Sequence, residues 1–172
     1  MIEKYCKGIC WVFIDAANII YSQKTLGWKV DYEKLIKYFK DNCNLGKIIY
    51  YTAYDPDNQK QKRFLDKLEI IGIKVRKKPL KLISETNADE EYIKKGNLDV
   101  ELTIDVIEDK DKYNTIILMS GDSDFAELIK HLRKYNKESI VISAKGHISI
   151  ELIQKSRKYI NLGKLRNKLE YK

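Results

Sequence analysis

The chain has 172 residues, of which 44% are hydrophobic and 34% are charged. This composition excludes a disordered chain, and no apolar run approaches the roughly 18–20 residues that span a bilayer, so no membrane is implied. Lysine and arginine number 33 against 25 acidic residues, and the net charge of +8 favours contact with a polyanion such as nucleic acid.

The first half of the chain alternates between apolar runs typical of buried strands and segments with helical periodicity. Between 31 and 42, apolar side chains recur at i, i+3, i+4 and i+7, which marks one face of a helix. The expected elements are a strand over 9–14, a helix over 31–42, a strand over 47–54, a helix ending at Gly72 and an extended basic segment over 73–83.

The second half continues the same alternation. Its expected elements are a helix over 98–108, a strand over 115–120, a helix beginning at Phe125, a strand over 139–144, a short helix over 148–155 and a basic tail over 164–172. Alternating strands and helices predict an α/β fold with a mainly parallel sheet covered on both faces. With two prolines and no linker-like tract, we expect a single domain over 1–172, with a core over about 9–145 and a basic C-terminal extension over about 146–172.

Acidic residues follow two of the predicted strands and begin one predicted helix. Asp15 follows the first strand, Asp122 follows the strand over 115–120, and Asp99 begins the helix over 98–108. In such sheets the site lies beyond the carboxyl ends of the strands, so these side chains are expected to meet. Two carboxylates about 5 Å apart repel by roughly 3 kcal/mol at an effective dielectric constant near 20, which a divalent cation removes. Carboxylate ligands favour Mg²⁺ or Mn²⁺, and basic surroundings point to metal-assisted cleavage of a phosphodiester.

Each acid also has a purely structural interpretation. Asp122 and Asp99 would both suit a helix N-cap, and Asn18 would suit a turn. Asp15 is harder to explain in this way, because a carboxylate that ends a wholly apolar strand is costly to bury without a partner. Asp105 lies about 120° from Asp99 around the helix, so we expect Asp99 to be the one that faces the site.

Three segments of the chain together resemble the NYN domain family, the LabA-like (DUF88) relatives of PIN-domain ribonucleases. They are FIDAANI (13–19), KKGNLDVELTID (94–105) and LMSGDSDFAELI (118–129). The resemblance covers about residues 9–145 and implies a three-layer PIN-like fold. It also implies a metal-dependent ribonuclease that cleaves RNA with Mg²⁺ or Mn²⁺.

The resemblance assigns five residues to the catalytic site. Asp15, Asp99 and Asp122 are implied to hold the metal. Asp124 completes the ligand set, directly or through water, and Asn18 orients a ligand, a water or a phosphate. The implied partner is RNA, expected to be single-stranded.

Basic residues near the predicted site are candidates for RNA binding. Arg76, Lys77 and Lys78 lie on the extended segment over 73–83, and Lys94 and Lys95 lie just before the acidic helix. Phosphate contacts by such residues position a strand without reading its sequence. The alternative is a solvated charged face with no ligand.

Other functions leave different signatures. The chain has no glycine-rich dinucleotide fingerprint and no P-loop, and Ala16 and Ala17 follow Asp15 where a haloacid-type phosphatase has Asp-x-Asp. A receiver-type phosphoacceptor would have a single aspartate rather than the pair in GDSD. A non-catalytic RNA-binding or regulatory adaptor with the same fold remains the main alternative, and a homodimer remains an alternative to a monomer.

The three cysteines, Cys6, Cys10 and Cys43, show no CxxC spacing and no nearby histidine pair. Their spacing therefore predicts neither a zinc site nor a disulfide framework, and we interpret them as small apolar side chains in a reducing compartment. The beginning of the chain also lacks the order of a signal peptide, because Asp15 interrupts its apolar stretch. Both observations predict a cytoplasmic protein.

Overall fold

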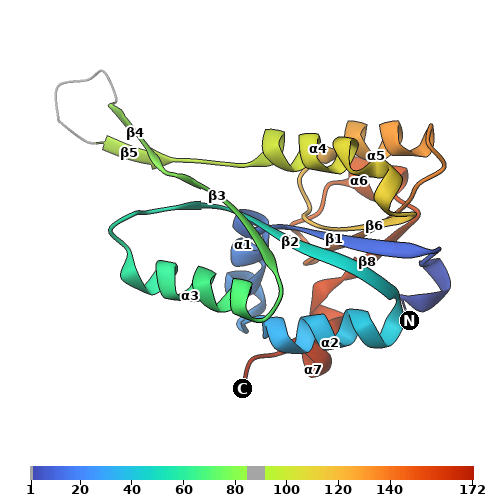
Figure 1. Cartoon of the computed structure of the whole chain (residues 1–172), viewed down its shortest axis with the longest axis horizontal. Helices are drawn as coiled ribbons and strands as arrows, with labels where there is room; N and C mark the ends of the chain where they lie inside the picture. The colour runs from blue at the N-terminus through green and yellow to red at the C-terminus, as the bar shows by residue number, and fades with distance from the viewer. Residues whose placement is uncertain (1, 85–91) are drawn as a thin grey trace.

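The computed structural model describes residues 2–84 and 92–172, and its centre is a six-stranded parallel sheet between two layers of helices (Figure 1). The strand order is β3-β2-β1-β6-β7-β8. The strands are β1 (Ile9–Asp15), β2 (Asn44–Tyr54), β3 (Lys74–Pro79), β6 (Thr115–Met119), β7 (Glu138–Ser143) and β8 (Lys158–Asn161). This architecture confirms the predicted three-layer α/β fold.

Helices cover both faces of the sheet. The α-helices are α1 (Ala16–Leu26), α2 (Tyr32–Asn42), α3 (Gln59–Ile70), α4 (Asp99–Glu108), α5 (Phe125–Arg133), α6 (Ile150–Lys155) and α7 (Arg166–Leu169). Short 3₁₀ helices are η1 (Glu3–Tyr5), η2 (Lys110–Lys112) and η3 (Leu162–Leu165). No helix in the described part of the chain is both long and apolar enough to cross a membrane.

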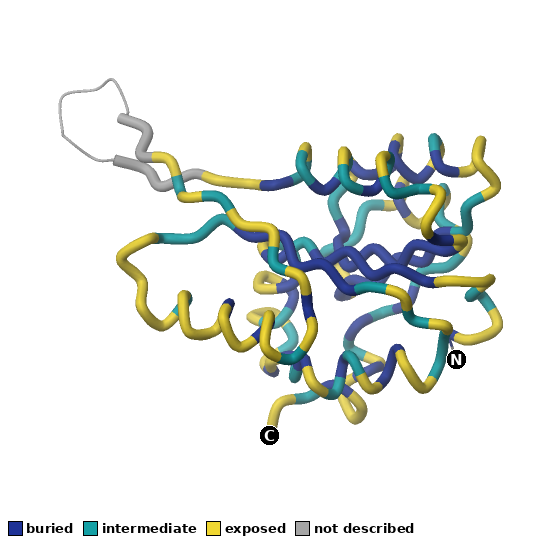
Figure 2. The backbone as a smooth tube through the Cα atoms, viewed as in Figure 1, coloured by how far each residue is buried: buried dark blue, intermediate teal, exposed yellow. Residues whose placement is uncertain are grey.

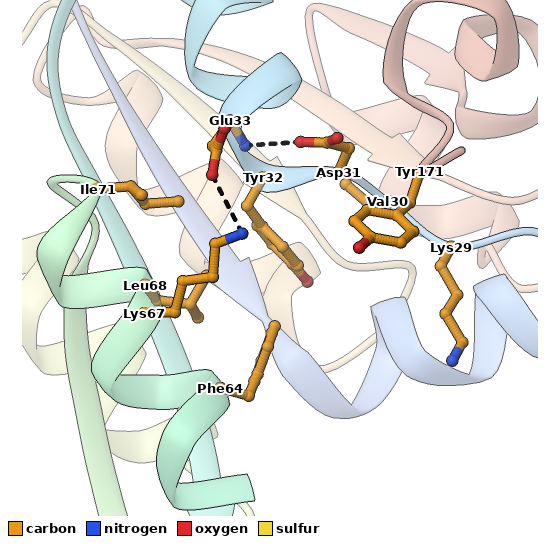
Figure 3. Close-up of a pocket in the computed structure, with 10 residues that line it drawn as sticks. All are labelled: Lys29, Val30, Asp31, Tyr32, Glu33, Phe64, Lys67, Leu68, Ile71 and Tyr171. Atoms are coloured by element: carbon orange, nitrogen blue, oxygen red, sulfur yellow. Dashed lines mark hydrogen bonds and ion pairs between the residues drawn. The ribbon is translucent and has the colours of Figure 1, made fainter. Parts of the chain in front are cut away.

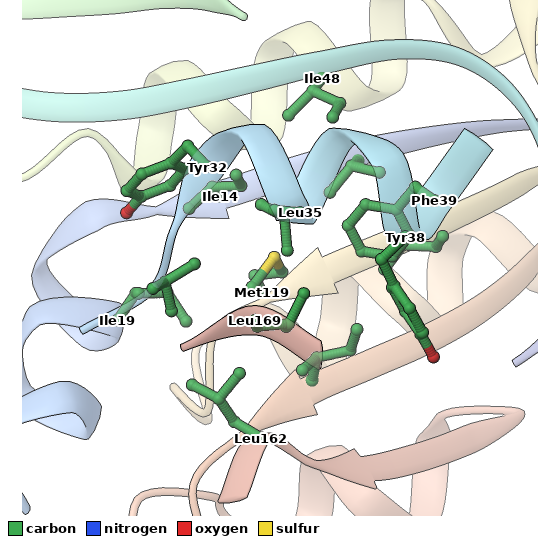
Figure 4. Close-up of a cluster of buried hydrophobic side chains, with 14 of the residues drawn as sticks. Ile14, Ile19, Tyr32, Leu35, Tyr38, Phe39, Ile48, Met119, Leu162 and Leu169 are labelled. Carbon is green, nitrogen blue, oxygen red and sulfur yellow. The ribbon is translucent and has the colours of Figure 1, made fainter. Parts of the chain in front are cut away.

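Strand β1 divides the core into two halves because its side chains alternate between the faces of the sheet. Val12 and Ile14 pack with α1, α2, α3 and α7, whereas Trp11 and Phe13 pack with α4, α5 and α6. Figure 4 shows the first of these halves, and Figure 2 shows that the central strands are buried along most of their length. Each large side chain buried in this way contributes roughly 1.5–3 kcal/mol to folding.

Helix α1 was not predicted from the sequence. It begins where the Asp15 side chain accepts a hydrogen bond from the backbone N–H of Asn18, and it ends at Gly27, whose φ is 72°. Its sequence hides the helical period, because Ile20 and Tyr21 are exposed while the small polar Ser22 is buried. Exposed apolar residues and a buried serine disrupt the apolar stripe on which such predictions depend.

The C-terminal segment also differs from the prediction. Residues 146–172 were expected as a basic extension beyond the core, yet β8 pairs in parallel with β7 and completes the sheet. Leu162, Leu165 and Leu169 are almost fully buried in the core shown in Figure 4. Elements of four residues are too short to show periodicity, so their leucines gave no usable signal.

Beyond the edge strand β3, the chain forms a separate two-stranded unit. Strands β4 (Lys81–Ser84) and β5 (Tyr92–Lys95) pair antiparallel, and Figure 1 shows them projecting away from the body of the molecule. The second strand leads directly into α4. The extended basic segment that we predicted over 73–83 therefore consists of β3 and the start of this projecting hairpin.

Candidate metal centre

The predicted site lies at the carboxyl edge of the sheet, between β1 and β6. These strands are parallel neighbours, and Ile14 is paired with Met119. Asp15 and the segment from Ser120 to Asp124 therefore leave the sheet side by side. From β1, the strands β2 and β3 follow on one side and β6, β7 and β8 follow on the other, so the strand order reverses between β1 and β6.

Asp15 is held by two hydrogen bonds from different elements. The Ser120 hydroxyl donates to its Oδ2 at 2.9 Å, and the backbone N–H of Asn18 donates to its Oδ1 at 3.2 Å. Burial raises the pKa of this carboxyl; the hydrogen bonds oppose the increase, and the charge of Asp122 adds to it. A carboxylate in this position is thus fixed in orientation but destabilised by its surroundings.

The turn after β6 orients the next two acids. The backbone N–H of Asp122 donates to Ser120 Oγ at 3.2 Å, and Asp122 Oδ1 accepts from the N–H of Asp124 at 3.0 Å. Gly121 is needed here for space, because a Cβ at this position would lie 1.6 Å from the carbonyl oxygen of His147. The turn is therefore packed tightly against the loop that follows β7.

Asp99 is the first residue of α4, and the Asn97 side chain donates to its Oδ2 at 2.6 Å. Burial raises its pKa to about 6, and the negative charges of Asp15, Asp122 and Asp124 contribute further to this increase. The four aspartates thus act on one another electrostatically, although they come from three separate parts of the sequence. We refer to Asp15, Asp99, Asp122 and Asp124 as the acid group.

The acid group is open rather than tightly closed. Among the described residues, no three of its carboxylates have oxygens that all lie within 4.8 Å of one another. Asn18 lies in the first turn of α1, and its Oδ1 is 3.3 Å from the Ser143 hydroxyl, for which the carbonyl oxygen of His147 at 3.0 Å is the nearer acceptor. Ser143 was not singled out in the sequence, although its place at the end of β7 follows the same rule that identified the acids.

A pocket of about 180 Å³ opens beside Asp15. It is lined by Asp15, Ala17, Ile20, Tyr51, Thr52, Ala53, Gln61, Leu80, Gly96, Asn97 and Leu98. The carboxyl end of β2 and the segment before α4 therefore form walls next to the acid group. A larger and mostly apolar pocket between α2, α3 and Tyr171 contains none of the predicted site residues (Figure 3).

Two of the basic residues proposed for RNA binding pair with acids of α4. Arg76 Nε lies 3.1 Å from Asp105 Oδ2, and Lys78 Nζ lies 2.8 Å from Glu101 Oε1. Both pairs join the edge strand β3 to α4, so these cations have a structural role that the sequence did not indicate.

The remaining basic candidates lie on β3 and on the hairpin. The exposed Lys77 places its ammonium group 5.8 Å from the centre of the Tyr54 ring. Lys94 and Lys95 lie in β5, opposite Leu82 and Lys81 on β4. Their side chains lie outside the described part of the structure.

Comparison with known proteins assigns the chain to a family. The family model described as NYN domain matches residues 10–163. The chain is 34% identical over 161 residues to the Low amplitude and bright protein LabA of Synechococcus elongatus, a match that covers 92% of this chain and 86% of LabA. The fold resembles the crystal structure of a protein of unknown function from Vibrio parahaemolyticus, with a TM-score of 0.74, 23% identity, and coverage of 91% of this chain and 93% of that one. The chain belongs to the NYN domain family, as its three sequence motifs predicted.

Proposed function

We propose that this protein is a divalent-metal-dependent ribonuclease that hydrolyses RNA phosphodiester bonds at the acid group. The observation that supports this most directly is the convergence of Asp15, Asp99 and Asp122 at one edge of the sheet, where burial and then the neighbouring charges raise the pKa of Asp99. An arrangement of this kind is costly to the fold unless a cation neutralises it. Membership of a family whose domains are generally nucleases adds independent support.

The donor set fits a hard cation. All four members of the acid group offer oxygen ligands, which suit Mg²⁺ or Mn²⁺ better than zinc. Asp15, Asp99 and Asp122 would hold the ion, and Asp124 would complete the set. The open spacing of the carboxylates suits a hydrated ion, since Mg²⁺ keeps several of its waters. When bound, such an ion neutralises charge on a phosphoryl oxygen and activates water for attack.

The chain's own residues would position the substrate. Asn18 lies beside Asp15, whose carboxylate its backbone N–H contacts, and its side-chain amide is proposed to orient a water or a phosphate. Lys77, Lys94 and Lys95 are proposed to contact the phosphates of a single-stranded RNA. Arg76 and Lys78 are proposed to join them by exchanging their carboxylate partners on α4 for a phosphate. We place this activity in the cytoplasm.

The test is cleavage of labelled single-stranded RNA with Mn²⁺ or Mg²⁺, with the matched duplex as the second substrate. Asp15→Asn removes the charge but retains a side chain that caps a helix well, so we expect a normal fold and an activity loss of about 100-fold or more. Asp122→Asn should likewise cost activity more than stability. Asp111→Asn is the matched control, since that side chain is 82% exposed and lies outside the acid group.

Two outcomes would contradict the proposal. Cleavage that survives both Asp15→Asn and excess EDTA would exclude a metal-dependent reaction at this site. Binding of RNA without cleavage, under every metal tested, would indicate a non-catalytic adaptor with the same fold.

A further inference from the structure

The three cysteines meet at the edge of the sheet opposite to the acid group. The sulfur atoms of Cys6, Cys10 and Cys43 all lie within 4.8 Å of one another. Among the side chains that the structure describes, they form the one group of three or more His, Cys, Asp or Glu residues that is so close. We call these residues the cysteine cluster. Their spacing in the sequence had predicted no zinc site.

Strand pairing and helix ends explain why these cysteines converge. Cys10 is the second residue of β1, and Cys43 immediately precedes β2, its parallel neighbour. The Cys43 N–H donates to the carbonyl oxygen of Phe39 at 2.9 Å, which fixes it as the C-cap of α2. Cys6 is brought back by the turn of η1, where its N–H donates to the carbonyl oxygen of Glu3 at 3.0 Å. The cluster therefore lies at the amino ends of the strands.

The thiol groups of the cysteine cluster make only weak hydrogen bonds to the backbone. The Cys43 thiol donates to the carbonyl oxygen of Phe39 at 3.0 Å. The Cys6 and Cys10 thiols donate at 3.6 and 3.7 Å to the carbonyl oxygens of Ile2 and Gly8. A cation that displaces these thiol protons converts the three sulfurs to thiolates and breaks only weak hydrogen bonds. Thiolates of this kind are the preferred ligands of thiophilic cations.

A buried polar group beside the cluster lacks a partner. Tyr38 is 5% exposed, and its hydroxyl has no hydrogen-bond partner within the described residues. Tyr38 belongs to α2, whose C-cap is Cys43, and it lies in the buried cluster against which Cys6 and Cys43 pack. An unsatisfied buried hydroxyl destabilises the fold, and a water held by a nearby cation would give it a partner.

We propose that Cys6, Cys10 and Cys43 bind one thiophilic cation, Zn²⁺ or Cu⁺. Tetrahedral zinc with sulfur at about 2.3 Å places its ligands roughly 3.8 Å apart, which agrees with the observed limit of 4.8 Å. Cys10 is fully buried, whereas Cys6 and Cys43 are partly exposed and leave an approach from solvent. Zinc is four-coordinate, so a water would be its fourth ligand beside the three thiolates, whereas Cu⁺ can be three-coordinate with the sulfurs alone. The ion would connect the N-terminal segment to β1 and to the end of α2.

The test uses the full chain, reduced and handled without oxygen, titrated with Zn²⁺ against a chromophoric chelator. We expect one Zn²⁺ per chain by native mass spectrometry, with a dissociation constant below about 1 μM and a rise in melting temperature that grows with metal concentration. Cys6→Ser and Cys43→Ser should each weaken binding by about 100-fold, while the exposed control Asp111→Asn leaves it unchanged. Cys10→Ser is avoided because that side chain is fully buried.

A parallel titration with Cu⁺ at matched free concentrations shows which of the two ions the protein binds more tightly. Tighter binding of either ion supports the proposed site if the binding depends on Cys6 and Cys43. Urea unfolding midpoints close to that of the unmodified chain show that both serine variants fold. Failure of the reduced protein to bind either ion below about 1 μM, or binding that survives both serine variants, would overturn the proposal. If the protein binds neither ion and the number of free thiols per chain falls from three to one on exposure to air, two of the cysteines form a redox-active pair instead.

Discussion

Each of the two carboxylate oxygens of Asp15 accepts a hydrogen bond. One accepts from the backbone N–H of Asn18 at the start of α1, and the other accepts from the hydroxyl of Ser120, which directly follows the neighbouring strand β6. The first contact alone is an ordinary N-cap, worth about 1 kcal/mol. The second has no role in the helix and fixes the carboxylate toward the turn that carries Asp122. A structural and a functional interpretation of this residue are therefore compatible.

Asp99 leads to a prediction about stability and pH. Its pKa of about 6 lies above the usual 3.8, so the folded protein disfavours the charged form. At pH 7 without metal, Asp99→Asn should therefore increase the free energy of unfolding by up to about 1 kcal/mol, after allowing for solvent screening of this partly exposed group. As the pH falls through about 6 towards 4, folded Asp99 takes up a proton that the unfolded chain does not, and the difference should disappear.

Urea unfolding of both proteins between pH 4 and pH 8 measures this effect, with Asp111→Asn as the control. Added Mn²⁺ should stabilise the unmodified chain more than Asp99→Asn. A variant that is less stable than the unmodified chain at pH 7 would show that the Asp99 carboxylate supports the start of α4 instead.

At the level of elements, β3 and α4 are joined through Asp105. Its side chain is 14% exposed and accepts hydrogen bonds from the Tyr51 hydroxyl at 2.9 Å and from Arg76. Asp105→Ala should cost about 2 kcal/mol in unfolding free energy, because it leaves the hydroxyl of a buried tyrosine without its acceptor. Arg76→Ala should cost less than about 1 kcal/mol, since that side chain is 45% exposed.

Chemical denaturation of the two variants, together with Asp105→Ala in a Tyr51→Phe background, separates the contributions. Removing both partners should recover part of the loss, because no unsatisfied hydroxyl remains. A larger cost for Arg76→Ala than for Asp105→Ala would mean that the ion pair, rather than the tyrosine, holds α4 in place.

The elements also show where sequence reasoning succeeded and where it failed. Apolar strands and striped helices were found because burial imposes a period on them. Helix α1 was missed because its exposed Ile20 and Tyr21 break that period. The convergence of Cys10 and Cys43 was missed for another reason. It depends on which strands become neighbours, and the spacing of cysteines along the chain carries no information about this.

For the whole molecule, the excess of positive charge predicts strongly salt-dependent RNA binding. Each phosphate contact with a single strand contributes about −0.7 to the slope of log affinity against log salt concentration. Lys77→Ala should therefore weaken binding and make the slope shallower by about 0.7. Lys40, an exposed residue of α2 near the amino edge of the sheet, provides the control, and Lys40→Ala should change neither quantity.

Fluorescence anisotropy of a labelled single-stranded RNA over a range of salt concentrations measures both quantities. The Asp15→Asn background is used because we expect it not to cleave the RNA. Equal slopes for Lys77→Ala and Lys40→Ala would remove β3 from the proposed RNA path and leave the hairpin as the remaining candidate.

The location of the candidate site could be predicted from the sequence to a useful extent, because one rule for parallel sheets links strand ends to sites. That rule, with the family motifs, identified Asp15, Asp99 and Asp122, whose mutual electrostatic influence the structure shows. The partners of the basic residues were not predictable, since Arg76 and Lys78 meet α4 only after the sheet has formed. Ion pairs between residues far apart in the sequence could not be predicted from the sequence alone.

The two outer strands of the sheet differ in how they limit self-association. Open edges invite strands from other molecules, which leads to aggregation. On β3, three consecutive lysine and arginine residues, Arg76, Lys77 and Lys78, precede Pro79, which has no N–H to donate, so a second copy of this strand would meet both charge repulsion and an interrupted ladder. On β8, four residues offer little length for pairing. The sheet should therefore stay at six strands even in a concentrated solution.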